Sequence, residues 1–171
     1  MEKTNKKITS TDFLYFALVI LGLAATVMLT NHTMREAQRT ETAKKEAERL
    51  AEWLTKAGEA RAKKESSGID ACDPPSEWAA CQEALLNKEG PIGGLHNVIE
   101  DDGLIVAETC DKEKSETHGA YIIENGVPPG PGLPPAWAAI TADTKLDAPL
   151  TLRVFVCGRS FHKIPVAEIK Y

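Results

Sequence analysis

Cysteine is missing from the first 60 residues of this 171-residue chain, although four cysteines follow. They are Cys72, Cys81, Cys110 and Cys157. An even number of cysteines confined to one half of a chain is typical of a disulfide-bonded domain in an oxidising compartment. How these thiols should be interpreted therefore depends on the side of a membrane on which they lie.

A basic patch and the common catalytic motifs are also missing. Lysine and arginine number 20 against 25 acidic residues, which gives a net charge of -5 and argues against a nucleic-acid partner. The chain has no P-loop, Rossmann fingerprint or Gly-x-Ser-x-Gly motif. Its four histidines are scattered, so a metal site would need an accident of tertiary structure. We therefore expect no enzymatic activity and no cofactor or metal.

Charge is absent from the run "FLYFALVILGLAATVML", residues 13–29. At 1.5 Å per residue this run is about 26 Å long, close to the hydrocarbon thickness of a bilayer. Thr30 can extend it, which predicts a transmembrane helix over residues 13–30 behind a cytoplasmic stub of residues 1–12. A cleaved signal peptide is the alternative, but its apolar region is shorter and ends at a small-x-small site. We expect an uncleaved signal anchor.

The positive charges flanking this run are nearly balanced. The N-terminal flank has Lys3, Lys6 and Lys7, and the other flank has Arg35, Arg39, Lys44 and Lys45. A short basic tail is typical of a signal anchor, and all four cysteines follow the run. We therefore expect a single pass through the bacterial inner membrane, with the C-terminal domain periplasmic or extracellular.

Small residues within the run offer a possible contact between helices. Gly22 and Thr26 form a small-xxx-small pair, a spacing that lets a partner helix approach closely. The alternative is that the pair reflects ordinary membrane-helix composition. If the contact forms, the partners are other membrane or envelope proteins, or a second copy of this chain.

Proline is absent from residues 31–64, and Gly58 is the only glycine there. Good helix formers dominate, so residues 31–65 are predicted to be a helical stalk. Residues 31–45 are mainly polar. Ala47, Leu50, Leu54 and Ala57 share one helical face, with Trp53 beside it. We expect Leu50, Trp53 and Leu54 to pack the C-terminal half of the stalk on the folded domain.

Residues 66–171 are predicted to form this domain. Residues 72–88 favour a second helix, with Asp73 or Ser76 as its cap. Strands are expected at residues 103–110, 119–124, 150–157 and 164–171, and a Pro/Gly loop at 125–137. Pro165 cannot donate to a ladder, so the final strand should lie at an edge. The result is an α+β fold in which a long amphipathic helix packs on a small antiparallel sheet.

The spacing of the cysteines favours disulfide bonds over metal binding. Eight residues separate Cys72 from Cys81, whereas paired zinc ligands usually have two to four between them, and no C-x-x-C redox motif is present. Four cysteines allow three connectivities, and free thiols are a further alternative. Proximity favours a Cys72–Cys81 bond, which leaves Cys110 and Cys157 to join two predicted strand ends.

The layout resembles that of type IV pilins and pseudopilins. Shared features are a short basic head, an apolar helix that continues as an amphipathic one, a small antiparallel sheet and a C-terminal disulfide loop, here Cys110 with Cys157. The stretch "KKITSTDFLYFAL" has no Gly before the apolar run, so we expect the N-terminus to be retained. The resemblance implies a structural or interaction component of an envelope or surface filament assembly. A membrane-tethered binding or sensing module is the alternative, followed by an anchored enzyme.

Overall fold

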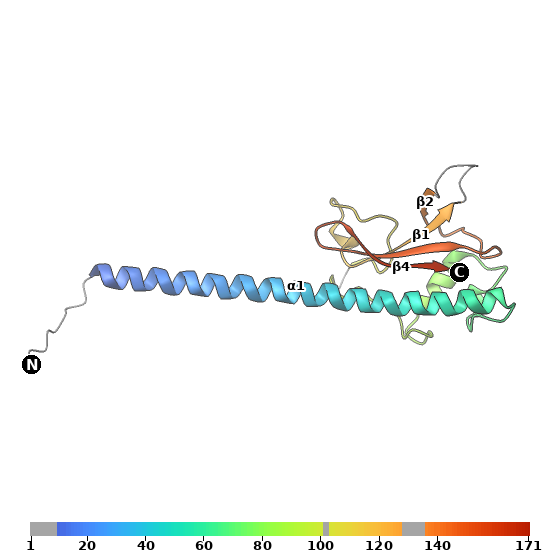
Figure 1. Ribbon diagram of the computed structural model, residues 1–171, viewed down its shortest axis with the longest axis horizontal. Coiled ribbons are helices and arrows are strands. Elements are labelled where there is room, and N and C mark those ends of the chain that lie inside the picture. The colour runs from blue at the N-terminus through green and yellow to red at the C-terminus, as the bar shows by residue number, and fades with distance from the viewer. Residues whose placement is uncertain (1–9, 101–102, 128–135) are drawn as a thin grey trace, which may run out of the picture. The chain divides into compact units, whose positions relative to one another are not determined.

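The computed structural model describes residues 10–100, 103–127 and 136–171 (Figure 1). Its helices are α1 (Ser10–Ala62), η1 (Asp70–Cys72), α2 (Trp78–Leu86) and η2 (Ser115–Thr117), and its strands are β1 (Tyr121–Val127), β2 (Ala136–Ala139), β3 (Thr151–Cys157) and β4 (Lys163–Lys170). Most of the predicted stub lies outside the described residues. The chain divides into two units, Met1–Gln38 and Arg39–Tyr171.

The first unit is the N-terminal part of α1. Among the described residues, this helix alone is long and apolar enough to cross a membrane. Its large apolar side chains are exposed, from Phe13 (73%) to Leu29 (68%). The Thr26 hydroxyl donates to the carbonyl of Gly22 at 2.8 Å, and Thr30 donates to the carbonyl of Thr26 at 2.9 Å. These hydroxyls are therefore hydrogen-bonded within their own helix.

In the second unit, the rest of α1 buries one face in the core. The predicted residues Ala47, Leu50, Leu54 and Ala57 are at most 1% exposed, and Trp53 is partly buried against the same cluster. The buried face begins earlier than the sequence suggested, because Ala43 is also fully buried. The expected polar stalk of residues 31–45 is therefore too long, since packing on the domain already includes its last residues.

The sheet has four antiparallel strands in the order β2-β1-β3-β4. Leu152, Val154 and Val156 alternate along β3, are fully buried and belong to the same core as α1. Figure 1 shows the strands running beside the cyan and green half of α1. β4 is an edge strand and contains Pro165, as predicted, with a bulge opposite Val154 and Phe155. The α+β fold and its small antiparallel sheet are confirmed.

One predicted strand is wrong. Residues 103–110 form only an isolated bridge, Val106 with Tyr121, and no regular strand. β3 occupies one edge of β1, and β2 with Ile140 occupies the other edge from Ile123 onward, which leaves Tyr121 to pair with this segment. Cys110 therefore does not end a strand, although Cys157 does.

The fourth strand is β2, which lies within the segment predicted to be a Pro/Gly loop. Ala136–Ala139 pair with the second half of β1, in the register Ala139 to Glu124. β1 itself runs to Val127, three residues beyond its predicted end. Alanine has low strand propensity, so the sequence "AWAA" gave little indication of a strand. The intervening residues 128–135 lie outside the described part of the chain.

The second helix is shorter than predicted, and neither predicted cap caps it. α2 begins at Trp78, after the Pro74–Pro75 turn, and its N-cap is Glu77 without a side-chain hydrogen bond. The amides of Trp78 and Ala79 instead donate to the carbonyls of Thr144 and Ala142, at 2.8 and 2.9 Å. Carbonyl groups of the loop after β2 thus accept hydrogen bonds from the first backbone amides of α2, which have no partner within the helix.

Candidate functional site

A groove of about 660 Å³ lies beside the C-terminal end of α1, within the second unit. The wall of this groove is mostly apolar. It is formed by the last turn of α1 and the loop that follows it, by the residues directly after η1, by residues 147–149 before β3, and by the end of β4. The lining residues are Gly58, Arg61, Ala62, Lys64, Glu65, Ser66, Asp73, Pro74, Asp147, Pro149, Lys170 and Tyr171. Three basic and three acidic side chains leave the groove without a dominant charge.

The end of α1 shapes one side of this groove. Lys64 adopts a left-handed conformation (φ 61°), and the Glu65 amide donates back to the carbonyl of Ala60 at 2.9 Å. Such bonds satisfy the last carbonyls of a helix as the chain turns away. Gly58 allows β4 to approach, because a Cβ at this position would lie 2.2 Å from the carbonyl oxygen of Lys170.

Arg61 is the main polar side chain of the groove. Its Nη2 donates to the carbonyls of Leu146 and Ala148, which ties the loop before β3 to α1. Its Cζ lies 4.4 Å from the ring centroid of Tyr171. Nη1 is buried and has no hydrogen-bond partner among the described residues. A buried donor without a partner lowers the stability of the fold.

Tyr171 joins the groove to the core. Its hydroxyl donates to the carbonyl of Cys72 at 2.9 Å and lies 4.0 Å from Cys81 Sγ. Its backbone pairs with Leu150 in both directions, at 2.6 and 2.7 Å. Burial raises the pKa of the Tyr171 hydroxyl, while the nearby Arg61 charge opposes the shift. The hydroxyl is therefore held in its neutral, donating form.

Asp73 fixes the loop between α1 and α2. Its carboxylate accepts hydrogen bonds from the Ser66 hydroxyl at 2.6 Å and from the Ser67 amide at 2.9 Å. Partial burial acts to raise the pKa of Asp73, but these hydrogen bonds and the Arg61 charge outweigh it and lower the pKa. Asp73 is thus an ionised loop anchor instead of the predicted helix cap.

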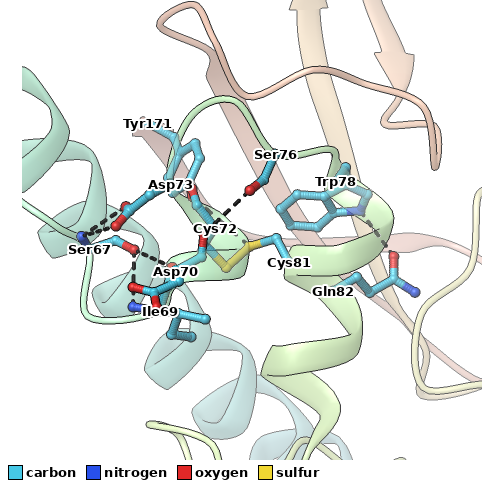
Figure 2. Close-up of a disulfide and its surroundings, with 10 residues drawn as sticks. All are labelled: Ser67, Ile69, Asp70, Cys72, Asp73, Ser76, Trp78, Cys81, Gln82 and Tyr171. Atoms are coloured by element: carbon cyan, nitrogen blue, oxygen red, sulfur yellow. Dashed lines mark hydrogen bonds between the residues drawn. A yellow bond between two sulfur atoms is a disulfide. The ribbon is translucent and has the colours of Figure 1, made fainter.

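The Cys72–Cys81 disulfide lies directly behind the groove. Figure 2 shows it connecting the loop that carries Asp73 to α2, with Tyr171 nearby. Both cysteines are fully buried, and their Cα atoms are 4.4 Å apart. In the same view Trp78 Nε1 donates to Gln82 Oε1 at 3.0 Å. The disulfide thus fixes the loop wall of the groove against α2.

The second disulfide joins Cys110 to Cys157, with Cα atoms 5.3 Å apart. Both bonds have the connectivity favoured by the sequence. This bond links β3 to the irregular segment that precedes η2, so it does not bridge two strands. No described cysteine is free.

The residues predicted to make helix contacts lie in two different units of the chain. Leu50 and Leu54 are buried in the core, whereas Gly22 and Thr26 belong to the exposed first unit. A Cβ added to Gly22 would have no neighbour within 4 Å. Arg61 and Tyr171 were not predicted, since residues 110 positions apart carry no signal of contact in one sequence. Asp73 was identified, but in a different role.

The groove offers a concave surface for binding. No group of three or more His, Cys, Asp or Glu side chains among the described residues could hold a metal ion. The groove instead combines apolar walls, a guanidinium stacked on a tyrosine and an anchored carboxylate. Comparisons with protein-family models, with curated proteins and with solved structures gave no match.

Proposed function

We propose that this chain is a single-pass membrane protein whose helix α1 anchors a folded extracytoplasmic domain, and that the domain is a structural or interaction component of a cell-envelope or surface filament assembly. One observation carries this proposal. The apolar side chains of residues 13–29 are exposed on a helix that continues into the domain. A continuous apolar surface of this length is unfavourable in water and favourable in a bilayer.

The internal bonding of this segment supports the proposal. Backbone groups in the hydrocarbon region must be satisfied within the segment, as they are in a helix. The hydroxyls of Thr26 and Thr30 also bond to carbonyls of the preceding turn, which lowers the cost of placing them in lipid. The segment therefore has few unsatisfied polar groups to expose to lipid.

The two disulfides support placing the domain outside the cytoplasm. Disulfides persist in oxidising compartments such as the bacterial periplasm and are rare in the cytoplasm. With the residues before the apolar run on the cytoplasmic side, the chain would be an inner-membrane protein with a periplasmic or extracellular domain. The Cys110–Cys157 bond would then form only after the domain has crossed the membrane.

The order of elements supports an assembly role of the pilin kind. An apolar helix precedes a four-stranded antiparallel sheet, and a disulfide closes a loop onto β3, as the resemblance to type IV pilins implies. Lateral contacts between membrane helices would use the small surface at Gly22, which has open space around it, and at the exposed Thr26. These contacts would recruit other envelope proteins or further copies of the chain.

Membrane fractionation tests the anchoring. We expect the wild-type protein to stay in the membrane pellet after an alkaline carbonate wash, and to enter solution only with detergent. Replacing both Leu18 and Leu21 by Arg should release it. Leu104→Arg is the matched control, because Leu104 is an exposed apolar residue (46%) of the folded domain. Release of the control, or retention of the double variant, would contradict the proposal.

The groove beside Arg61 favours a second candidate, a tethered binding module. Its volume lies within the range of small-molecule sites, and such sites combine apolar walls with a few polar groups. A ligand with an apolar body and a carboxylate would suit the apolar walls and the positive charge of Arg61. Native mass spectrometry of the detergent-extracted protein separates the two candidates: a monomer carrying a small molecule favours the module, and a multi-copy complex favours the assembly protein.

A further inference from the structure

We propose that the outer edge of β2 is an interface through which two copies of this chain pair antiparallel, joining their sheets into one. β2 is an edge strand, since β1 is its only neighbour in the sheet among the described residues. An edge strand presents backbone donors and acceptors that can pair with a further strand.

The register shows which groups point outward. Ile140 continues the β1–β2 register, and its amide donates to the carbonyl of Ile123 at 2.9 Å. In an antiparallel pair, successive residues direct their backbone groups alternately toward and away from the partner strand. Ala138 therefore faces β1. Trp137 and Ala139 direct their N–H and C=O groups to the outer edge, where no described residue pairs with them.

This edge is complementary to a second copy of itself. When two β2 strands run antiparallel about a two-fold axis through Ala138, Trp137 of each lies opposite Ala139 of the other. Each of these pairs can exchange two backbone hydrogen bonds, so all four outward groups of both strands are used. The two Ala138 residues then form a non-hydrogen-bonded pair, with Cα atoms about 4.5 Å apart.

Side-chain contacts fix the position of β2 on the sheet. The ring of Trp137 lies against Gly126 of β1, where an added Cβ would come within 3.3 Å of two ring atoms. Arg153 of β3 covers the same ring, with Cζ 3.7 Å from its centroid. Arg153 also donates to Glu168 of β4 at 3.0 Å. A chain of contacts across all four strands thus fixes the short edge strand.

The opposite edge of the sheet is less suited to pairing. β4 contains Pro165, which has no amide hydrogen, and a bulge interrupts its register with β3. Charged side chains also line it, including Lys163, Glu168 and Lys170. Such features protect edge strands from association. β2 has neither a proline nor a charge.

A four-residue pairing buries little surface, well below the total of about 1,200 Å² that specific interfaces usually bury. Its strength therefore rests on the proposed anchoring, because tethering to one membrane raises the effective concentration of the two edges. Formation of the pair and anchoring of the chain are separate measurements, so either can fail alone.

Cysteine cross-linking in native membranes tests the pairing. The described native cysteines are all in disulfides, so an introduced cysteine supplies the reactive thiol. Ala138→Cys places two thiols across the two-fold axis, within the range of a disulfide. Mild oxidation should convert most of this variant to a covalent dimer. Ala136→Cys is the matched control, also exposed on β2, but its two copies would lie about 13 Å apart along the strands.

A third variant tests the backbone contact itself. Adding Ala139→Pro to Ala138→Cys removes an outward amide hydrogen and leaves the ladder to β1 intact, so the cross-link should be lost. A melting temperature close to that of Ala138→Cys alone would show that the fold persists. Equal cross-linking of the 136 and 138 variants, no dimer from the 138 variant, or a product containing a different protein would each overturn the proposal. Sedimentation of the same samples with membranes reports the anchoring independently.

Discussion

The guanidinium of Arg61 covers the ring of Tyr171, with Cζ 4.4 Å from the ring centroid. Arg61 lies in the last turn of α1 and Tyr171 follows β4, so this contact joins the helix to the sheet. Arg61 also binds two carbonyls of the loop before β3, and Tyr171 binds the carbonyl of Cys72. One pair of side chains thus holds together four segments that are distant in sequence.

Arg61→Lys should lower the free energy of unfolding by about 1–2 kcal/mol, because an ammonium group cannot bind both carbonyls and stack on the ring in the same way. Urea unfolding of the detergent-solubilised chain, followed by tryptophan fluorescence, measures the change. Arg35→Lys is a control in the first unit, where Arg35 lies exposed. An unchanged urea midpoint for Arg61→Lys would show that the contacts of Arg61 do not stabilise the domain.

Gly58→Ala should destabilise the protein, although alanine is the better helix former. The added Cβ would lie 2.2 Å from the Lys170 carbonyl oxygen and 2.8 Å from Tyr171 Cα. Overpacking of this kind costs about 1–3 kcal/mol, which exceeds the helix-propensity gain of about 1 kcal/mol. Gly22→Ala in the same helix meets nothing within 4 Å and should leave the melting temperature of the domain unchanged. Equal melting temperatures for the two variants would contradict this packing.

Removing the long disulfide loop should have the larger effect on stability. Cys110–Cys157 has a sequence separation of 47 and Cys72–Cys81 one of 9. In the chain-entropy model these loops are worth about 4 and about 2.7 kcal/mol. Cys157→Ser should therefore lower the melting temperature more than Cys81→Ser does. The reverse order would show that packing around the buried Cys72–Cys81 bond outweighs loop entropy.

The domain should lose stability at high pH. Burial raises the pKa of Tyr121 and of Tyr171 above the ordinary value of 10.0. Because the folded state favours the neutral phenols, this stability is complete below pH 10 and declines as pH rises further. Urea midpoints at pH about 8 and about 11 measure the loss. Tyr171→Phe should make it smaller, and an unchanged pH dependence in that variant would exclude Tyr171 as a cause.

The long helix and its buried face could be predicted because their signals are local. Ala47, Leu50 and Leu54 recur with helical spacing, and the alternation in residues 150–157 indicates β3 directly. The segment 103–110 has the composition of a strand, yet it meets β1 only at Tyr121, because β2 and Ile140 take this edge from Ile123 onward. Strand pairing is decided by competition between distant segments, which a single sequence does not reveal.

The candidate groove illustrates the same limit. Asp73 was identified from its position before a helix, but its partners are Ser66 and Ser67 in the preceding loop. Arg61 and Tyr171 meet only because β4 returns to the end of α1 through the close contact at Gly58. The disulfide pairing was favoured correctly by proximity, because the first bond closes a short loop and leaves one remaining pair.

Protease protection most directly tests the central claim, that α1 anchors an extracytoplasmic domain. Protease is added to intact spheroplasts, and the chain is followed with a tag at its C-terminus. We expect loss of the tagged domain before lysis, while a cytoplasmic marker protein stays intact. A tagged domain that is protected until the membrane is broken, or one that remains soluble after gentle lysis, would contradict the account.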